Sequence, residues 1–454
     1  MAAALLLLPF RVAAAQTTPP PNFVFILTDD QPVGTVGGMR NVSTIMANGT
    51  AFENAIISNP LCCPSRTTIL TGLYSHGNGV YTNGDGSDPS GGYPAFTAHD
   101  DEDRTFALAL HDAGYHVGLF GKYLNHYDGS PQPGWDAFHS FVGSNGSYYD
   151  YDWTIDFAAP VLHGSDPTDY STDVAGSEAK AWLASLDPTQ PFFLYFAPFG
   201  PHGPITPAPQ DAGATTSTSF ATAAYNETDV SDKPTYIQAL PLYGASHTSY
   251  LEGLWDDQYA TLLSIDRWVG ALRDTLAQAG TLANTYFIFM SDNGLTWGDH
   301  RWNNKIVPYE RSIRVPMLIT GPGVAKRHVR QVVSNVDLSS TILDLAGVAP
   351  MTTDGVSLSG VLSGGSISRP GVLLEHKFYP SRPVPSYCGF RTVRFMFARY
   401  DDGDGIQEEE LYNLHKDPDE LRNIVAFNPS KATQMRNASY AAGCDPTIVP
   451  PPSG

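Results

Sequence analysis

Short runs of apolar residues alternate with amphipathic segments along most of the chain. The apolar runs are typical of strands buried on both faces, and they occupy residues 22–28, 116–120, 192–196, 286–290 and 315–320. The amphipathic segments carry apolar residues at helical spacing, and they occupy residues 105–113, 172–186 and 256–279. This alternation predicts an α/β fold in which helices cover both faces of a mostly parallel sheet.

The composition of the sequence and the length of its segments change at about residue 369. Beyond this point the segments are shorter, more polar and richer in Tyr and Arg, which indicates a small α+β subdomain. We therefore expect a main domain over residues 17–368 and a C-terminal subdomain over residues 369–454. Residues 211–250 are rich in Ala, Thr, Ser and Asp, and we expect them to form a long surface insertion beside a cleft.

The first residues have the features of a targeting signal. Residues 2–10 are uncharged and mostly apolar, and three alanines precede Gln16, as signal peptidase prefers. This stretch is too short to span a bilayer, and no later segment predicts a membrane span. We expect a signal peptide over residues 1–16 and a secreted or extracytoplasmic protein. Its potential glycosylation sites are Asn41, Asn48, Asn145, Asn226 and Asn437.

The chain is strongly acidic. It has 26 Lys and Arg against 46 Asp and Glu, which gives a formal net charge of −20. Such a surface repels the phosphate backbone of nucleic acids and excludes a general nucleic-acid-binding role. Any anionic substrate must therefore be held by positive charge concentrated in one place.

The four cysteines form two pairs of different character. Cys62 and Cys63 are adjacent, and adjacent cysteines rarely bond to each other without strain. Cys388 and Cys444 lie near the end of the chain, where we expect a disulfide in an oxidising compartment. No Cys-x-x-Cys spacing occurs, so we expect no structural zinc site.

Oxygen-bearing side chains follow two of the predicted strands. Asp29 and Asp30 come directly after the run at 22–28, and Asp292 and Asn293 come just after the run at 286–290. Ligands collect at the carboxyl ends of strands in open α/β sheets, and such oxygens suit a hard cation such as Ca²⁺ or Mg²⁺. Each Asp alone is more often a turn residue, so the prediction depends on both segments together.

The most specific motif is the string LCCPSR at 61–66, which continues as TTILTG at 67–72. It resembles the signature of the type I, formylglycine-dependent sulfatases, which have an alkaline-phosphatase-like fold. In that family the first cysteine is oxidised to formylglycine by a separate generating enzyme. The resemblance assigns this role to Cys62, leaves Cys63 as the variable position, and implies that Arg66 contacts the nucleophile or its metal. The alternative is that Cys62 is only a buried thiol.

The modification has a chemical reason. A hydrated aldehyde is a geminal diol, and a bound cation eases formation of the attacking oxygen. The sulfated diol can then expel sulfate by returning to the aldehyde, whereas a sulfated serine would await hydrolysis. The motif also predicts a short helix whose amino-terminal amides face the sulfate.

Further blocks resemble sulfatase motifs in the expected order. They are GKYLN at 121–125, PHGP at 201–204, SDNG at 291–294 and KIVPYE at 305–310. The resemblance implies that Lys122 and Lys305 hold sulfate oxygens and that His202 protonates the departing ester oxygen. It adds the modified Cys62 to the ligands of the cation, for which we expect Ca²⁺, with Mg²⁺ as the alternative.

One position departs from the family pattern. Many sulfatases carry a histidine two positions after the first lysine, where this chain has Leu124. His126 could replace it as the base that releases sulfate, or Asn125 could contact the sulfate while another group acts as the base. His300 is a further candidate for lining the site.

Several blocks look most like the N-acetylglucosamine-6-sulfatase and arylsulfatase branch, and they include YCGFRT at 387–392 and ELYNL at 410–414. The resemblance implies a secreted hydrolase acting on an aryl or sugar sulfate such as N-acetylglucosamine 6-sulfate. One alternative is a phosphonate or phosphate monoester hydrolase with the same site. The other is an inactive carbohydrate-binding relative, which predicts that some metal or nucleophile residues are missing, yet all of these are present.

Overall fold

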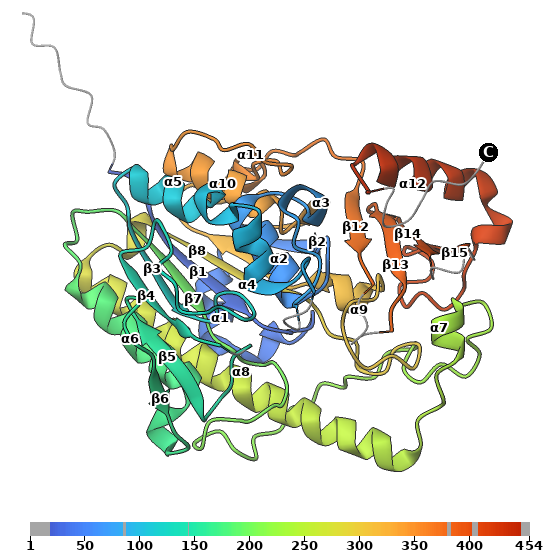
Figure 1. Cartoon of the computed structure of the whole chain (residues 1–454), viewed down its shortest axis with the longest axis horizontal. Helices are drawn as coiled ribbons and strands as arrows, with labels where there is room; N and C mark the ends of the chain where they lie inside the picture. The colour runs from blue at the N-terminus through green and yellow to red at the C-terminus, as the bar shows by residue number, and fades with distance from the viewer. Residues whose placement is uncertain (1–18, 85–87, 144, 379–382, 402–406, 446–454) are drawn as a thin grey trace, which may run out of the picture.

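The computed structural model describes residues 19–84, 88–143, 145–378, 383–401 and 407–445. The expected signal peptide, residues 1–16, lies outside the described residues. Figure 1 shows a large α/β body that carries the first part of the chain and a smaller sheet and helix that carry its end. Within the described ranges, no helix is both long and apolar enough to cross a membrane.

An eleven-stranded sheet forms the centre of the body, in the order β11-β2-β10-β8-β1-β7-β3-β4-β5-β6, with β9 paired to β2. The strands are β1 (Asn22–Thr28), β2 (Thr50–Ile56), β3 (His116–Gly121), β4 (Ala137–Phe141), β5 (Tyr151–Ile155), β6 (Val161–His163), β7 (Phe192–Ala197), β8 (Thr285–Ser291), β9 (Arg314–Val315), β10 (Met317–Thr320) and β11 (Arg327–Ser334). The run from β8 to β4 is parallel, as predicted, whereas β5, β6, β9 and β10 pair antiparallel to their neighbours.

The expected strand at 315–320 is divided between β9 and β10. Pro316 lies between them and has no backbone N–H to donate to a ladder. The other predicted strands are present within one residue at each end.

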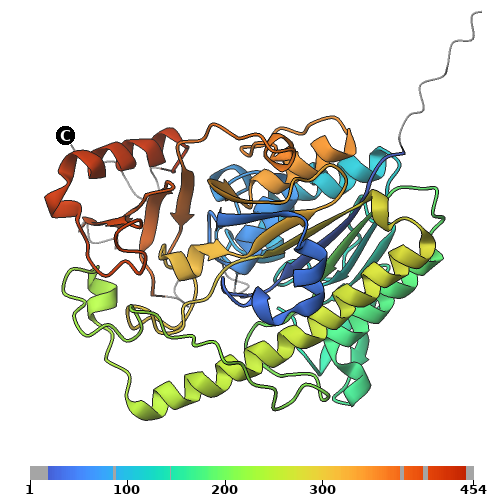
Figure 2. The same ribbon diagram turned by 180° about the vertical axis from the view of Figure 1, so that it is seen from behind.

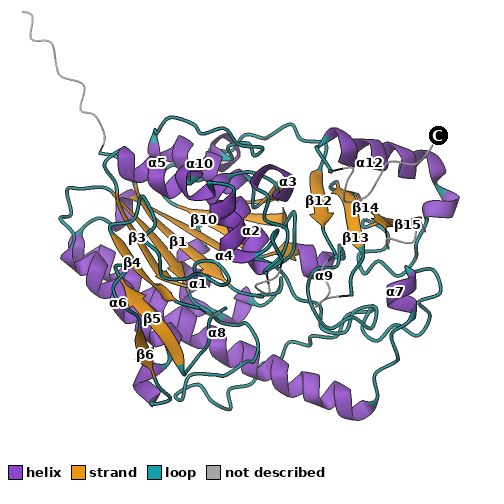
Figure 3. Ribbon diagram, viewed as in Figure 1, coloured by secondary structure: helices purple, strands orange, loops and turns teal. Residues whose placement is uncertain are grey.

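Helices cover both faces of the sheet, as Figures 2 and 3 show. The α-helices are α1 (Arg40–Met46), α2 (Cys62–Thr71), α3 (Ser75–Asn78), α4 (Gly92–Ala98), α5 (Phe106–Asp112), α6 (Ser171–Ser185), α7 (Thr235–Gln238), α8 (Ala245–Ala279), α9 (Glu310–Ile313), α10 (Asp337–Ala346), α11 (Ser359–Leu362) and α12 (Pro429–Ala441). Short 3-10 helices occupy Val36–Gly38, Asp101–Arg104, Pro167–Asp169, Leu282–Asn284 and Val425–Phe427.

Strand β1 shows why the apolar runs are continuous. Phe25 and Leu27 belong to the core shared with α2, α5 and α10, whereas Val24 and Ile26 belong to the core shared with α1, α6 and α8. Both faces of the strand are therefore buried, and no polar alternation remains in the sequence.

Helix α8 begins eleven residues before the predicted segment, at Ala245. Its first turns are largely exposed and polar, so they lack the apolar stripe by which a helix is recognised. The expected insertion at 211–250 therefore consists of loops, α7 and the start of α8.

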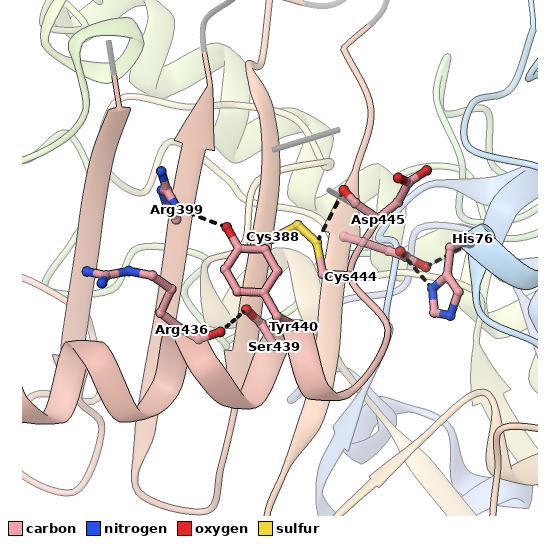
Figure 4. Close-up of a disulfide and its surroundings, with 9 residues drawn as sticks. His76, Cys388, Arg399, Arg436, Ser439, Tyr440, Cys444 and Asp445 are labelled. Carbon is pink, nitrogen blue, oxygen red and sulfur yellow. Dashed lines mark hydrogen bonds and ion pairs between the residues drawn. A yellow bond between two sulfur atoms is a disulfide. The ribbon is translucent and has the colours of Figure 1, made fainter. Parts of the chain in front are cut away.

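The last part of the chain forms a four-stranded antiparallel sheet covered by α12, which confirms the expected small α+β unit. Its strands, in spatial order, are β12 (Val372–His376), β13 (Ser386–Arg391), β14 (Phe395–Asp401) and β15 (Gln407–Asn413). The expected disulfide joins Cys388 on β13 to Cys444 just after α12, and Arg399 lies beside it, donating to Tyr440 Oη at 2.9 Å (Figure 4). The exact domain boundaries at 17–368 and 369–454 stay a prediction.

Candidate active site

The carboxylates expected at two strand ends do lie together. Strands β1 and β8 pair in parallel register up to Thr28 and Ser291, so both chains leave the sheet at the same level. The N–H of Asp292 donates to the Thr28 carbonyl at 3.0 Å, and the N–H of Asp30 donates to Asp292 Oδ1 at 3.2 Å. These contacts lock the two turns to each other.

Cys62 lies at the first position of α2, beside these turns. Its side chain is fully buried, and the thiol donates to Asp29 Oδ1 at 3.4 Å while accepting from Lys305 Nζ at 2.7 Å. The next residue points elsewhere: the N–H of Cys63 donates to Asn83 Oδ1 at 2.8 Å. The side chain of Asn83 therefore accepts a hydrogen bond from one of the backbone amides at the start of α2. The sequence alone did not predict this contact.

Three buried cations face three buried carboxylates around Cys62. The pairs are Lys122 with Asp29, Lys305 with Asp30 at 2.5 Å, and Arg66 with Asp292 at 2.8 Å. Buried charges are tolerated when they are paired and hydrogen-bonded, which holds here. The six formal charges cancel, so a divalent cation bound here would give the site a net positive charge that attracts an anion.

Burial and charge set the protonation of the central groups. Burial and the neighbouring Asp29 carboxylate raise the pKa of the Cys62 thiol to about 12. Burial opposes ionisation of Asp29, but Lys122 and its other positive neighbours hold the pKa of that carboxyl well below its usual range. The unmodified Cys62 is therefore a neutral thiol beside an ionised carboxylate.

His202 lies at the edge of the cluster, on the loop after β7. Its Nε2 is 3.6 Å from Asp30 Oδ2, its Nδ1 faces the Gly203 carbonyl, and its ring packs on Phe199 with centroids 4.8 Å apart. Tyr148 Oη donates to the His202 carbonyl at 2.9 Å and fixes the loop. Burial lowers the pKa of His202, which favours the neutral imidazole.

The structure also gathers possible metal ligands. One ligand atom each from Asp29, Asp30, Cys62 and His202 lies within 4.8 Å of the others. Nearby, Asn293 Oδ1 is buried without a hydrogen-bond partner among the described residues, which leaves an amide oxygen available. Carboxylate and amide oxygens suit Ca²⁺ or Mg²⁺, whereas an imidazole nitrogen also suits zinc, so the donors alone leave the ion open.

A cleft of about 360 Å³ opens beside the cluster. One side of it carries Asp30, His202 and Lys305. The remaining lining residues are Gly203, Pro204, Ile205, Tyr250, Leu254, Leu295, Trp297, Asn303 and Asn304. Most of these come from α8 and from the loop after β8, where no motif signals them in the sequence.

The three expected substrate-binding residues are not among those that line this cleft. Asn125 is buried, and its Oδ1 has no hydrogen-bond partner in the described structure. His126 has a φ of 62° and places Nε2 3.1 Å from the Gly84 carbonyl. His300 is buried, with Nδ1 2.6 Å from Glu227 Oε2. Their roles stay predictions.

The backbone beside Lys305 is held by the C-terminal sheet. Ile306 has a φ of 84°, a left-handed value that a β-branched residue rarely adopts. Tyr387 on β13 donates its hydroxyl to the Ile306 carbonyl at 2.6 Å, and Trp302 Nε1 donates to the Lys305 carbonyl at 3.0 Å. Tertiary contacts thus maintain the unfavourable conformation that directs Lys305 to Cys62.

Two protein-family models match the sequence. The model described as Sulfatase matches residues 21–348, and the model described as N-sulphoglucosamine sulphohydrolase, C-terminal, matches residues 298–438. The first match covers both strand-end turns and the start of α2.

Relatives show how far this likeness extends. The N-acetylglucosamine-6-sulfatase of Homo sapiens is 33% identical, and the match covers 92% of this chain and 82% of the human protein. The extracellular sulfatase SULF-1 homolog of Drosophila melanogaster is 35% identical over 75% of this chain, but the chain spans only 31% of that protein. It spans 48% of a Sulf-1 homolog of Caenorhabditis elegans.

A solved structure is similar in fold. It is a complex of a protein with its substrate D-glucosamine-2-N,6-O-disulfate, and it aligns with a TM-score of 0.76 at 25% identity. The alignment covers 93% of this chain and 97% of that chain.

Proposed function

The chain belongs to the sulfatase family, and from this premise we propose that it hydrolyses a sulfate monoester of a sugar, with N-acetylglucosamine 6-sulfate as the first candidate. The observation that carries the proposal is the position of Cys62, buried between Asp29 and Lys305 where the two strand ends meet. The 33% identity to the human N-acetylglucosamine-6-sulfatase, over 92% of this chain, supports the choice of sugar.

Formylglycine derived from Cys62 is the proposed nucleophile. Sγ does not itself line the cleft, but it lies 2.7 Å from Nζ of Lys305, which does. When formed, that group supplies an attacking oxygen and later releases sulfate by returning to the aldehyde. The lysine ammonium that now donates to Sγ would stabilise negative charge on the same oxygen or on sulfate.

The proposed metal ligands are Asp29, Asp30, Asp292, Asn293 and the modified Cys62, with Ca²⁺ as the proposed ion. The buried, unpartnered Asn293 Oδ1 and the carboxylate pair after β1 fit a hard cation. When bound, the ion supplies positive charge that favours the deprotonated nucleophile.

The remaining side chains have complementary proposed roles. Lys122 and Lys305 would hold sulfate oxygens, and Arg66 would balance the carboxylates. His202 borders the cleft, where it can give a proton to the leaving oxygen at the moment of bond cleavage. Burial lowers the pKa of His202, and its neighbour Asp30, 3.6 Å away, opposes this effect by favouring the protonated ring that the step requires.

Two further proposals concern the export and the modification of the protein. We propose that it is exported, in keeping with the expected signal peptide and the disulfide. We also propose that it depends on a formylglycine-generating enzyme for activity. Asn48, Asn145 and Asn437 are exposed and would be available for glycosylation, whereas Asn41 and Asn226 are half-buried.

The direct test combines mass spectrometry with turnover. Protein purified from a cell that makes formylglycine should show a Cys62 peptide carrying the aldehyde, and it should release sulfate from N-acetylglucosamine 6-sulfate in the presence of Ca²⁺. A matched aryl phosphonate should be turned over more slowly than the aryl sulfate. Faster turnover of the phosphonate, or an unmodified and fully active Cys62, would contradict the proposal.

Tyr387 lies outside the cleft, but its hydrogen bond to Ile306 should influence turnover. Replacing Tyr387 with phenylalanine removes only the hydroxyl that holds Ile306, so Lys305 should lose its fixed position. We expect kcat to fall about tenfold and sulfate to inhibit less strongly, with a stability loss of about 1 kcal/mol. Steady-state kinetics with sulfate as product inhibitor and thermal unfolding measure these changes.

A second substitution separates positioning from general destabilisation. Glycine adopts positive φ without strain, so Ile306→Gly in the Tyr387→Phe background should recover part of kcat, even though removal of the buried Ile306 side chain lowers stability further. A Tyr387→Phe enzyme with unchanged kcat and unchanged sulfate inhibition would show that the hydroxyl does not position Lys305.

A further inference from the structure

The cleft beside Lys305 has a second wall that the proposed chemistry does not use. This wall is formed by Ile205, Tyr250, Leu254, Leu295 and Trp297, which are apolar or aromatic. The volume of about 360 Å³ lies in the range of sites for single small molecules. This volume is larger than a sulfate group needs. The remaining space can hold the organic part of the substrate, which would then contact the apolar wall.

Tyr250 is the unusual member of this wall. Its side chain is 60% exposed, whereas Trp297 behind it is 2% exposed and packs edge-on against Trp255 at 5.2 Å. Leu254 lies one helical turn further along α8 on the same face. Tyr250 is therefore not an isolated exposed side chain but the outer part of one apolar surface that lines the cleft.

The start of α8 is anchored, so Tyr250 has a defined position. Tyr243 Oη donates to the Arg301 carbonyl at 2.7 Å, and Tyr225 Oη is hydrogen-bonded to Thr248 Oγ1 at 2.7 Å. Arg301 belongs to the same loop that carries Lys305. The segment that carries Tyr250 and the loop that carries Lys305 are therefore joined by a hydrogen bond. This reduces the entropic cost of binding a ligand between the two side chains.

The cleft also has a polar edge. Asn303 is exposed and Asn304 is half-exposed, and both line the same cavity. The Oδ1 of Asn304 accepts from the Lys305 N–H at 2.9 Å, so the amide nitrogen is the part of this side chain that can donate to a ligand. An aryl ring needs only the apolar wall, whereas a pyranose offers an apolar C–H face and a rim of hydroxyls. The combination of aromatic wall and amide edge fits the pyranose.

We propose that Tyr250 is a stacking platform for the pyranose ring that carries the sulfate, with Asn303 and Asn304 contacting its hydroxyls. This inference rests on the proposed function for the direction of the substrate, since the sulfate must lie at Lys305. The Tyr250 ring covers the C–H face of the sugar and contributes binding energy equally in the ground state and in the transition state. Tyr250 is thus a specificity-determining residue that takes no part in proton transfer.

The first experiment needs no turnover. Unsulfated N-acetylglucosamine is titrated into the mature enzyme, and binding is followed by saturation-transfer NMR on the ring protons. We expect Tyr250→Ala to weaken binding about five- to tenfold, and Tyr250→Phe to retain it within about twofold because the ring remains. Leu242→Ala, which removes another exposed apolar side chain outside the cleft, should leave binding unchanged. Absence of binding by the wild type, or equal binding by Tyr250→Ala, would overturn the platform.

The second experiment uses kinetics. With N-acetylglucosamine 6-sulfate, Tyr250→Ala should raise KM about five- to tenfold and keep kcat within about twofold, since uniform binding is lost. An equal KM for the wild type and Tyr250→Ala would overturn the inference while leaving the proposed function intact. If the wild type binds the sugar through Tyr250 but releases no sulfate from it, the proposed function fails and the platform stands. A larger loss with an aryl sulfate than with the sugar sulfate would also overturn the pyranose assignment.

Discussion

Replacing Cys62 with alanine should reduce sulfate release to background, a fall of about 10⁵-fold or more, because no other group occupies the place of the nucleophile. Cys62→Ser should also fail in multiple turnover, since a sulfated serine cannot release sulfate by returning to an aldehyde. It should accumulate one covalently bound sulfate per chain. Initial-burst kinetics and intact-protein mass spectrometry measure both outcomes.

Cys63→Ala is the matched control for this result. Cys63 is equally buried, but its N–H donates to Asn83 Oδ1 at 2.8 Å, whereas the hydrogen bonds to Asp29 and from Lys305 involve the thiol of Cys62. The control should remain active, with a modest loss of stability from the small cavity. Equal inactivation by Cys63→Ala, with Cys62 still converted to the aldehyde, would mean that the nucleophile has been assigned to the wrong cysteine.

Replacing Asp292 with asparagine should remove the bound cation and lower turnover by about 10³-fold. The change keeps the shape of a side chain that accepts from the Asp30 N–H, but it removes a charge that pairs with Arg66 at 2.8 Å. Arg66 would then keep only its 3.5 Å ion pair with Asp29, and the weakened pairing should cost about 3 kcal/mol of unfolding free energy. Elemental analysis, turnover and thermal unfolding should be measured on the same preparation.

Asp337→Asn separates metal loss from destabilisation. Asp337 is also fully buried and pairs with Arg369 at 2.6 Å, but it lies away from the cation site. Its substitution should lower stability to a similar extent and leave metal content unchanged. Stoichiometric zinc in the wild type, or full activity after exhaustive chelation, would contradict the calcium proposal.

The sequence predicted the parts of the fold that rest on burial. Strand β1 lies in the middle of the sheet with cores on both sides, so Val24 and Phe25 are both apolar and the run is easily recognised. The first turns of α8 were missed because their side chains face solvent on most sides. The loop just before that helix is held by contacts with other loops, such as Tyr243 with Arg301, and these leave no periodic pattern.

For the candidate site, the sequence named the residues that stand in motifs or next to strands, but not those that hold them in place. Asp29 and Asp292 stand next to apolar runs, and Cys62 stands in a long motif, so the residues could be named before their positions were known. Asn83 and Tyr387 act through single hydrogen bonds to backbone atoms of distant segments. Such contacts depend on how loops pack, and one isolated Asn or Tyr in a sequence carries no sign of them.

If Cys62 is the precursor of formylglycine, as proposed, its complete burial makes the timing of the conversion decisive. In the folded chain its thiol lies at 0% exposure beneath Asp29 and Lys305, which arrive from segments on either side of it in the sequence. A modifying enzyme must therefore act before Asp29 and Lys305 cover the start of α2. Every chain that folds before the enzyme acts keeps an unmodified Cys62. The fraction of active protein then depends on the relative rates of folding and oxidation. A variant or a culture temperature that slows folding should yield more aldehyde per chain, even if the folded protein itself is unchanged.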